Sequence, residues 1–405
     1  MSKFVKLSSI AELTVGFVGT MAKHYEDEGI PFLRSLNIKP FKIIGDDMKY
    51  VSAEFSNSLS KSILHKGDVV IVRTGIPGTC CVVPAEYDGC NCSDVVIVHP
   101  NTELVNPHYL AAYINVWGQR QIANNKVGAI QQHFNVHSAE EMLIFLPDIT
   151  EQEKIAKMIV ALNGKIENNT SVCAKLESMT KTLYDYWFTQ FDFPDENGKP
   201  YRSSGGEMVW NDQLNREIPK GWNVGQLSDI ANIAMGQSPA GETYNENGNG
   251  MIFYQGCTDF GTRFPVPRVY TTAPTRFAKS GDILMSVRAP VGTLNVAIED
   301  CSIGRGLAAL NSKIGSQLYL WYTLAGFKQL FNVLDGNGTT FGSITKDTLY
   351  ETKVVIPNPV LVKSFEEIVQ PIEQKIRIIE EENRELTKLR DWLLPMLMNG
   401  QATVE

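Results

Sequence analysis

Two short loops of glycine and proline could bind an anion through their backbone. "GIPGT" covers residues 75–79 and "APVGT" covers residues 289–293. Successive backbone N–H groups in such a loop can form an anion-binding concavity, and Arg73 and Arg288 place a positive side chain near each loop. The same segments could equally be tight turns that link two strands. Because the pattern occurs twice, we expect both loops to do the same kind of job at two places.

Four cysteines lie close together in the sequence. Cys80, Cys81, Cys90 and Cys92 could ligate zinc. Neighbouring residues on a strand point to opposite faces, however, and no C-x-x-C pair is present. The total of seven cysteines is odd, and the N-terminus has no apolar signal segment, which argues against disulfides. We therefore predict reduced structural thiols and no metal site.

A search for catalytic motifs finds one approximate match. "NPHY" at residues 106–109 approximates the Asn-Pro-Pro-Tyr loop with which DNA amino-methyltransferases hold a flipped base. His108 replaces the second proline, and no glycine-rich cofactor loop follows a strand upstream. A helix start with proline in its first turn explains the segment better. No GxxxxGK[ST], HExxH or GxSxG motif occurs, so the corresponding nucleotide, zinc and acyl-transfer chemistry is not predicted.

The composition is that of an ordinary globular protein. The chain has 405 residues, of which 43% are hydrophobic and 20% charged, which suits two or three domains. No apolar run approaches the ~20 residues of a membrane span. Because the N-terminus also has no apolar signal segment, we expect a cytoplasmic protein. The net charge of −8 argues against a surface that binds nucleic acid everywhere, although it permits local basic faces.

An internal repeat runs through the whole chain. "KGDVVIVRTGIPGT" and "KSGDILMSVRAPVGT" share the same order of glycine, aspartate and threonine. Leu7 corresponds to Leu227 and Leu176 to Leu386, so the offset changes only from 220 to 210 residues. We infer two divergent copies of one unit of ~200 residues. Each begins with short β-rich stretches and continues into a helix, which predicts tandem domains of the α+β class.

Each copy ends in a long helix with an apolar seam. Apolar side chains recur there at spacings of three, four or seven, which is typical of a coiled coil, and forty helical residues extend ~60 Å. We expect the two helices to pair with each other; the alternative is that each packs on its own globular part. The expected seam consists of Ile166, Cys173, Leu176, Leu183, Ile376, Ile379, Asn383, Leu386 and Leu393, together with Asn169 and Trp187.

These signals give the order of the domains. A first mixed domain, a helix, a connector, a second mixed domain and a second helix with a C-terminal tail are predicted at residues 1–148, 149–190, 191–217, 218–358 and 359–405. The connector is rich in Asn, Asp, Gly, Ser and Pro and is expected to be ordered. Its aromatic residues Tyr201 and Trp210 are expected to dock on the helix or on the next domain.

The repeated motifs resemble a known family. "LSDIA", "GQSP", "GDIL" and "GT", closing on a proline and a long helix, are similar in order to the DNA specificity subunit of type I restriction-modification enzymes. The resemblance covers essentially the entire chain, except that "TVGFVGTMA" in the first copy departs from "MGQSPAG" in the second. It implies two target-recognition domains that each read one half of a split sequence in double-stranded DNA. It also implies that the helices pair antiparallel and act as a ruler between the domains.

The resemblance implies partners and leaves this chain without catalysis or a cofactor of its own. Two modification subunits, docked on the paired helices, would bind S-adenosylmethionine and methylate an adenine in each half-site. Restriction subunits, which combine a motor with a nuclease, would use ATP and Mg. Two other hypotheses stay open: a free-standing DNA methyltransferase or nuclease, and a coiled-coil scaffold without sequence preference.

Exposed polar loops are the expected DNA contacts, because their side chains can address groove edges or phosphates. In the first copy the candidates are Arg34, Ser35, Asn37, Arg73, Thr74, Lys126, Gln131, Gln132 and His133. In the second copy they are Gln237, Ser238, Gln255, Arg263, Arg268, Arg288, Thr339, Thr340 and Ser343.

Overall fold

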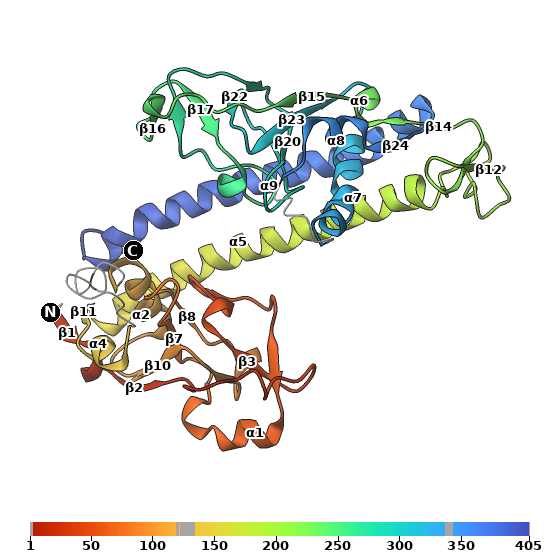
Figure 1. Ribbon diagram of the computed structural model, residues 1–405. Helices are drawn as coiled ribbons and strands as arrows, with labels where there is room; N and C mark the ends of the chain where they lie inside the picture. The colour runs from red at the N-terminus through yellow and green to blue at the C-terminus, as the bar shows by residue number, and fades with distance from the viewer. Residues whose placement is uncertain (1–2, 119–120, 122–133, 337–342, 405) are drawn as a thin grey trace. The chain divides into compact units, whose positions relative to one another are not determined.

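The computed structural model describes residues 3–118, 121, 134–336 and 343–404. The chain divides into two compact units (Figure 1). Unit 1 contains Met1–Asn168 and Asn383–Glu405, and unit 2 contains Asn169–Glu382. Each unit therefore holds one mixed domain and a part of each long helix.

Unit 1 is built around a four-stranded antiparallel sheet. Its strand order is β2–β10–β7–β8, at Ala11–Val15, Val95–Pro100, Val69–Val72 and Cys80–Val82. A smaller sheet has the order β6–β3–β9, at Lys49–Val51, Ile30–Leu33 and Asn91–Cys92. Two further strand pairs, β1–β11 and β4–β5, lie at Lys3–Lys6, Leu143–Leu146, Ile38–Lys39 and Lys42–Ile43. Short helices α1, α2 and α4 cover Ala53–Ser58, Pro107–Tyr113 and Val136–Glu140.

Unit 2 repeats this plan. Its main sheet has the order β15–β23–β20–β21, at Ala231–Met235, Leu307–Ser312, Ile283–Ser286 and Leu294–Val296. The second sheet has five short strands in the order β16–β18–β17–β22–β19, at Tyr244–Asn245, Tyr270–Thr271, Met251–Tyr254, Cys301–Ile303 and Phe277–Ala278. Strand pairs β14–β24 and β12–β13 lie at Asn223–Gln226, Lys353–Ile356, Met208–Asn211 and Arg216–Pro219. Helices α6, α7 and α8 cover Leu227–Ile230, Gln317–Gly336 and Lys346–Glu351.

The central strand β7 is buried on both faces because its side chains alternate between two cores. Val69 belongs to the same core as Tyr109 of α2, and Val70 belongs to the same core as Leu33 of β3. In unit 2, β20 alternates in the same way between a core that includes α7 and a core that includes β17. The main sheet is therefore a middle layer in each unit, which explains why its inner strands β7 and β20 read as apolar runs.

The repeated Gly-Asp pair builds the same turn in both units. Gly67 and Gly281 have φ of 93° and 89°, a left-handed conformation that glycine adopts without strain. Asp68 and Asp282 each accept a hydrogen bond from the backbone N–H three residues earlier, at 2.7 and 2.8 Å. The sequence repeat thus reflects one turn design that starts the central strand twice.

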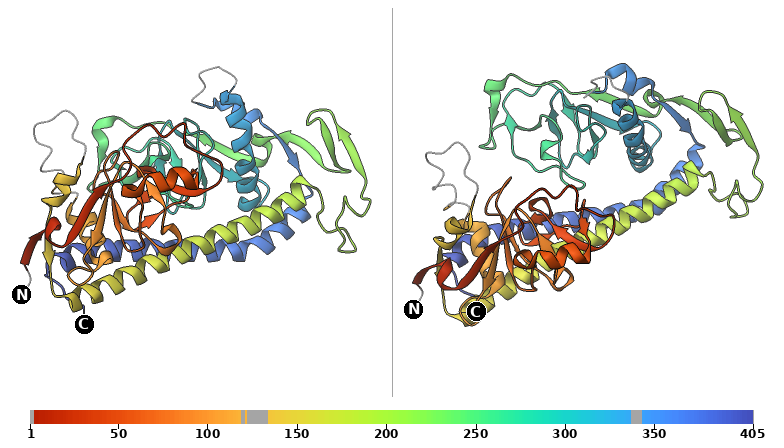
Figure 2. Two further views of the ribbon diagram at one scale, coloured as in Figure 1. Left: turned by 90° about the horizontal axis from the view of Figure 1, so that it is seen from below. Right: turned by 60° about the horizontal axis from the view of Figure 1, so that its bottom comes forward.

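The long helices α5 and α9 span Ile149–Tyr184 and Pro359–Met398, and a π-helical segment, Asp185–Thr189, follows α5. In each unit, parts of both helices lie side by side and run in opposite directions (Figure 2). In unit 1, Arg390 donates to Asn163 at 3.0 Å, and in unit 2 Asn169 donates to Glu382 at 2.7 Å. Of the expected seam, Cys173, Ile376 and Ile379 form one buried cluster with Leu176 packed against it.

Other expected seam residues contact the domains or are less buried. Trp187 belongs to the unit 2 domain core and Leu183 packs against it, while Leu393 packs against the unit 1 domain core. Ile166 and Leu386 are half-buried, whereas Asn169 and Asn383 are buried. Within each unit, parts of the two helices therefore contact each other and also their own domain, because a helix that touches a second helix still presents another stripe to the domain.

The connector is ordered, as predicted. Tyr201 stacks on Phe193 of the connector itself at 4.7 Å between ring centroids, rather than directly on the helix or the next domain, and Phe193 stacks on Trp222 at 5.2 Å. The prediction that Trp210 docks on another element is wrong, because its side chain is 59% exposed and its indole N–H donates to Asp212.

The seven cysteines are free thiols, as predicted, and all but Cys257 are buried. Among the described residues, no group of histidine, cysteine, aspartate and glutamate side chains could hold a metal ion. Within the same residues, no helix is long and apolar enough to cross a membrane.

Candidate nucleic-acid interface

The two glycine-proline loops are hairpin turns. "GIPGT" links β7 to β8 and "APVGT" links β20 to β21, and both strand pairs are antiparallel. The N–H groups of Gly78 and Gly292 donate back to the preceding strand, at 3.1 and 2.9 Å. Because the turns use these donors internally, the tight-turn interpretation holds and these N–H groups are not free for an anion.

Three segments converge at one loop in each unit. In unit 1, this loop joins β9 to β10: Ser93 donates its N–H to Leu33 and Asp94 accepts from the N–H of Arg73 at 3.2 Å. In unit 2, the corresponding loop joins β22 to β23. The N–H of Gly304 donates to the carbonyl of Tyr254, and the carbonyl of Gly306 accepts from the N–H of Val287 at 2.9 Å. Arg34 and Gln255 follow the matching strands β3 and β17, so the two candidates occupy equivalent places.

In unit 1 the candidates at this loop are held by protein partners. Arg34 donates to a carboxylate oxygen of Asp47 at 2.9 Å; Lys49 and Arg34 together lower the pKa of Asp47. Arg73 is half-buried and donates from Nε to the carbonyl of Phe134 at 3.1 Å. Thr74 donates its hydroxyl to Asp94. These contacts fix the side chains and reduce the number of groups that are free for DNA.

Asn37 corrects a prediction. Its side chain is 0% exposed, and its amide donates to the carbonyls of Ile44 and Asp46 at 3.2 and 3.0 Å. Its side-chain oxygen accepts the N–H of Arg34 at 3.1 Å and so caps the 3-10 turn that begins at the half-buried Ser35. The buried amide cannot reach a groove edge.

Unit 2 brings three candidates together. Gln255 donates to the hydroxyl of Ser238 at 2.9 Å, and Ser238 also accepts from the N–H of Arg305 at 3.3 Å. Gln237 is exposed beside them. A Cβ at Gly236 would lie only 2.2 Å from the carbonyl oxygen of Gly304, so glycine is what allows the two segments to meet.

Exposed arginines surround this cluster. The carbonyl oxygen of Arg276 accepts a hydrogen bond from the N–H of Ile303. Arg288 forms an isolated β-bridge with the exposed candidate Ser343. Within the described residues, Arg276, Arg288 and Arg305 form no ion pair, so they give the cluster a positive character. Arg276 and Arg305 were not among the residues predicted from the sequence, although "GRG" at 304–306 places an arginine between two glycines.

The other second-copy arginines have different environments. Arg268 is exposed but pairs with Asp259 at 2.8 Å. The prediction for Arg263 is wrong, because its side chain is 1% exposed and pairs with Glu373. Lys126, Gln131, Gln132, His133, Thr339 and Thr340 lie outside the described residues.

Comparisons with known proteins agree with this architecture. The sequence matches the family described as type I restriction modification DNA specificity domain over residues 2–178 and again over 219–388. A relative from Methanocaldococcus jannaschii, named for the MjaX specificity subunit of a type I restriction enzyme, is 29% identical and covers 96% of this chain and 91% of its own length. The HindI specificity subunit of a type I restriction enzyme from Haemophilus influenzae is 22% identical and covers 87% of this chain and 91% of its own length.

A solved structure shares the fold. The S subunit of a type I restriction-modification system from M. genitalium is 16% identical to this chain and aligns with a TM-score of 0.57, over 98% of this chain and 96% of the other. The chain therefore belongs to the type I restriction-modification DNA specificity family and carries two copies of its domain.

Proposed function

We propose that this chain is the non-catalytic subunit that selects the DNA target of a type I restriction-modification complex. Each domain reads one half of a split sequence in double-stranded DNA. The observation that carries the proposal is the duplication: the main sheets of the two domains share one strand order, and each domain gathers polar loops at the same strand ends. In unit 2 these loops present glutamine, serine and exposed arginine, which suit base edges and phosphates.

The helices α5 and α9 form one antiparallel coiled coil in this proposal. The opposed contacts between α5 and α9 in each unit support the pairing. A helix of 36 to 40 residues extends ~54–60 Å. Readers on one face of DNA lie about one turn, ~34 Å, apart, so such a rod is long enough to set the spacer between half-sites.

The chemistry belongs to partner subunits. Two modification subunits bind S-adenosylmethionine and methylate one adenine in each half-site, and restriction subunits use ATP and Mg. The complex acts in the cytoplasm, where it meets DNA. With a net charge of −8 on this chain, partners supply much of the phosphate contact.

Selection from random DNA tests the proposal. The chain, assembled with its modification subunits, is incubated with a library of random duplexes, and the bound DNA is sequenced. We expect two enriched blocks at a fixed separation. Enrichment of no sequence would favour the scaffold hypothesis, and S-adenosylmethionine binding by the chain alone would favour the free-standing methyltransferase.

A further inference from the structure

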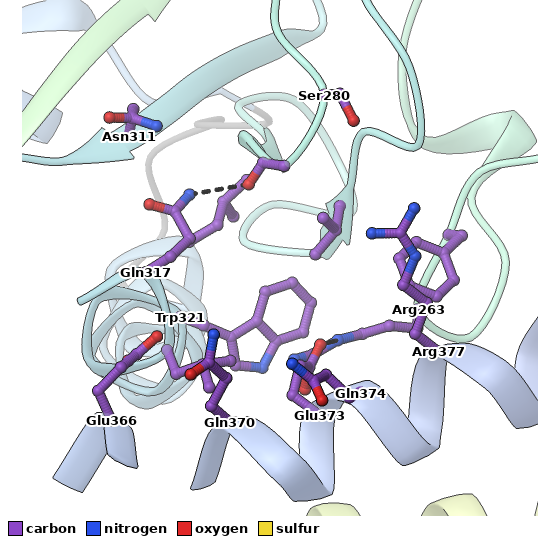
Figure 3. Close-up of a pocket in the computed structure, with 15 residues that line it drawn as sticks. Arg263, Ser280, Asn311, Gln317, Trp321, Glu366, Gln370, Glu373, Gln374 and Arg377 are labelled. Atoms are coloured by element: carbon purple, nitrogen blue, oxygen red, sulfur yellow. Dashed lines mark hydrogen bonds and ion pairs between the residues drawn. The ribbon is translucent and has the colours of Figure 1, made fainter. Parts of the chain in front are cut away.

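Arg263 joins the second domain to both long helices. It lies in the loop between β17 and β18, and its side chain is 1% exposed. Its Nε and Nη2 atoms donate to the two carboxylate oxygens of Glu373 on α9, at 2.9 and 2.5 Å. Its Nη1 atom lies 4.0 Å from Glu177 on α5. The guanidinium also stacks on Trp321 of α7, at 3.6 Å from the ring centroid (Figure 3).

The arginine offsets an acidic cluster between the helices. Burial raises the pKa of Glu177, and the nearby Glu373 and Glu380 raise it further, while Arg263 lowers it. Without the guanidinium, only mutual repulsion and the desolvation cost of these carboxylates would remain. The fork of Arg263 matches the Glu373 carboxylate in a bidentate geometry, which lysine cannot reproduce.

The loop that carries Arg263 is also hydrogen-bonded to the main sheet. The carbonyl oxygen of Arg263 accepts the N–H of Val296 in β21 at 2.9 Å. Asn295, also in β21, donates to the carbonyl of Gly261 at 3.0 Å. The side chain of Arg263 therefore cannot shift along α9 without moving the sheet that supports the candidate DNA contacts.

A second attachment lies further back along α9. Phe365 packs on Phe188 and Trp187 with ring centroids 5.2 and 6.0 Å apart, and Phe188 packs on Tyr319 of α7 at 4.9 Å. Glu373 follows Phe365 by eight residues, which is ~12 Å along a helix. One attachment alone would allow the domain to pivot, whereas two separated attachments set its angle.

Between the two attachments, side-chain packing adds little further restraint on this angle. A cavity of about 450 Å³ separates the domain from α9 there, lined by the domain residues Ser280 and Asn311 and by Gln370 and Gln374 of α9 (Figure 3). Because side chains do not fill this space, the Arg263–Glu373 pair carries a larger share of the restraint.

Unit 1 has a related contact in which the arginine lies on the helix α9 instead of on the domain. Arg390 of α9 stacks over Phe41 of the domain at 5.1 Å from the ring centroid and donates to Asn163 of α5. In each unit, one arginine thus joins a domain loop to both helices.

We propose that Arg263 is a positioning residue that fixes the angle of the second recognition domain on the helices and thereby sets the spacer length that the complex accepts. The proposal rests on the function proposed above. One base pair changes the separation of two half-sites by ~3.4 Å and their relative rotation by ~35°, so a fixed angle discriminates between spacers.

Methylation rates on three duplexes test this role. The duplexes carry the natural half-sites with the natural spacer or with one base pair more or fewer, and the complete complex is assayed with S-adenosylmethionine. For the unaltered chain we expect the natural spacer to be methylated about tenfold faster than either altered spacer, because each change is a helical step of ~35°. Arg263→Met should lower this ratio at least about threefold, and Arg263→Lys should lower it less, because it keeps the charge without the fork.

The ratio of the methylation rates on natural and altered spacers distinguishes a positioning role of Arg263 from a role in folding alone. A variant that only folds poorly loses the same fraction of activity on all three duplexes, so its ratio stays at the unaltered value. Glu373→Gln, which keeps the side-chain shape and removes the charge, should lower the ratio as Arg263→Met does. Lys220→Met removes the exposed ion pair between Lys220, at the start of the second domain, and Glu207 of the connector, and serves as the control, with an unchanged ratio.

An unchanged ratio in both Arg263→Met and Glu373→Gln would overturn the positioning role. If the unaltered complex methylated no split site at all, the proposed function itself would fail.

Discussion

The Nδ1 atom of His99 lies 2.7 Å from a carboxylate oxygen of Asp68, and the amide nitrogen of Asn311 lies 3.0 Å from the matching oxygen of Asp282. In both units the other carboxylate oxygen caps the Gly-Asp turn. The two copies therefore keep one hydrogen-bonding design, but only the first copy has a partner that titrates near neutral pH.

His99→Asn should remove a pH-dependent part of the stability. The hydrogen bond to Asp68 raises the pKa of His99 above 6.5, burial opposes this, and Asp68 and Glu12 add to the rise through their charge. A raised folded-state pKa contributes stability that is complete below pH 6.5 and is lost as the pH rises through the folded pKa. Urea unfolding from about pH 5.5 to 9 should show a higher free energy of unfolding for the unaltered chain than for the variant at acidic pH. The two free energies should become equal at basic pH.

The reciprocal change is the control. Asn311→His should introduce the same acid-side stabilisation in unit 2, where the carboxylate of Asp282 is already in place. Parallel pH profiles for the unaltered chain and His99→Asn would show that the pair does not couple to folding.

Two isoleucines on α9 test the contact between the helices in unit 2. Ile376 is 1% exposed in the cluster with Cys173 and Ile379, whereas Ile378 is 60% exposed. Ile376→Asp should lower the free energy of unfolding by about 3 kcal/mol or more, because it buries a charge without a partner. Ile378→Asp should change it by less than about 1 kcal/mol, a helix-propensity effect. Equal losses in urea unfolding would contradict the observed packing.

The loop cluster of unit 2 should read one half-site only. Gln255→Ala or Arg305→Ala removes a side chain from the cluster around Ser238. If the side chain contacts a base, discrimination at one position should fall by about 1–3 kcal/mol, with the other half-site unchanged. Binding to duplexes with single base changes measures this. Lys199→Ala, in the exposed connector, should leave every position unchanged. Equal weakening at both half-sites would contradict the assignment of one domain to one half.

Thiol reactivity tests the cysteine environments. Burial raises the pKa of Cys90 to about 11 and that of Cys173 and Cys301 to about 12, and it also raises those of Cys80, Cys81 and Cys92. The thiolate is the reactive form, so a disulfide reagent at about pH 8 should modify only the half-buried Cys257 quickly. All seven should react in urea. Rapid reaction of several thiols in the folded chain would contradict the buried placement.

Local patterns predicted the elements better than the environments of the loop residues. The repeated Gly-Asp pair indicated a repeated turn, because both the glycine conformation and the aspartate cap depend on neighbours within three residues. The burial of Arg263 depends on Glu373, which lies 110 residues away, so no local spacing could indicate it. Asn37 looks like an exposed loop residue in the sequence, yet two carbonyls up to nine residues away fold back over it.

The measurement that tests the central claim most directly is long-read mapping of N6-methyladenine in cells that express this chain with its modification subunits. The account predicts a split motif with one methylated adenine in each half and a fixed spacer, and the loss of this methylation when the chain is deleted. Methylation that persists unchanged without the chain would contradict the claim that this protein selects the target.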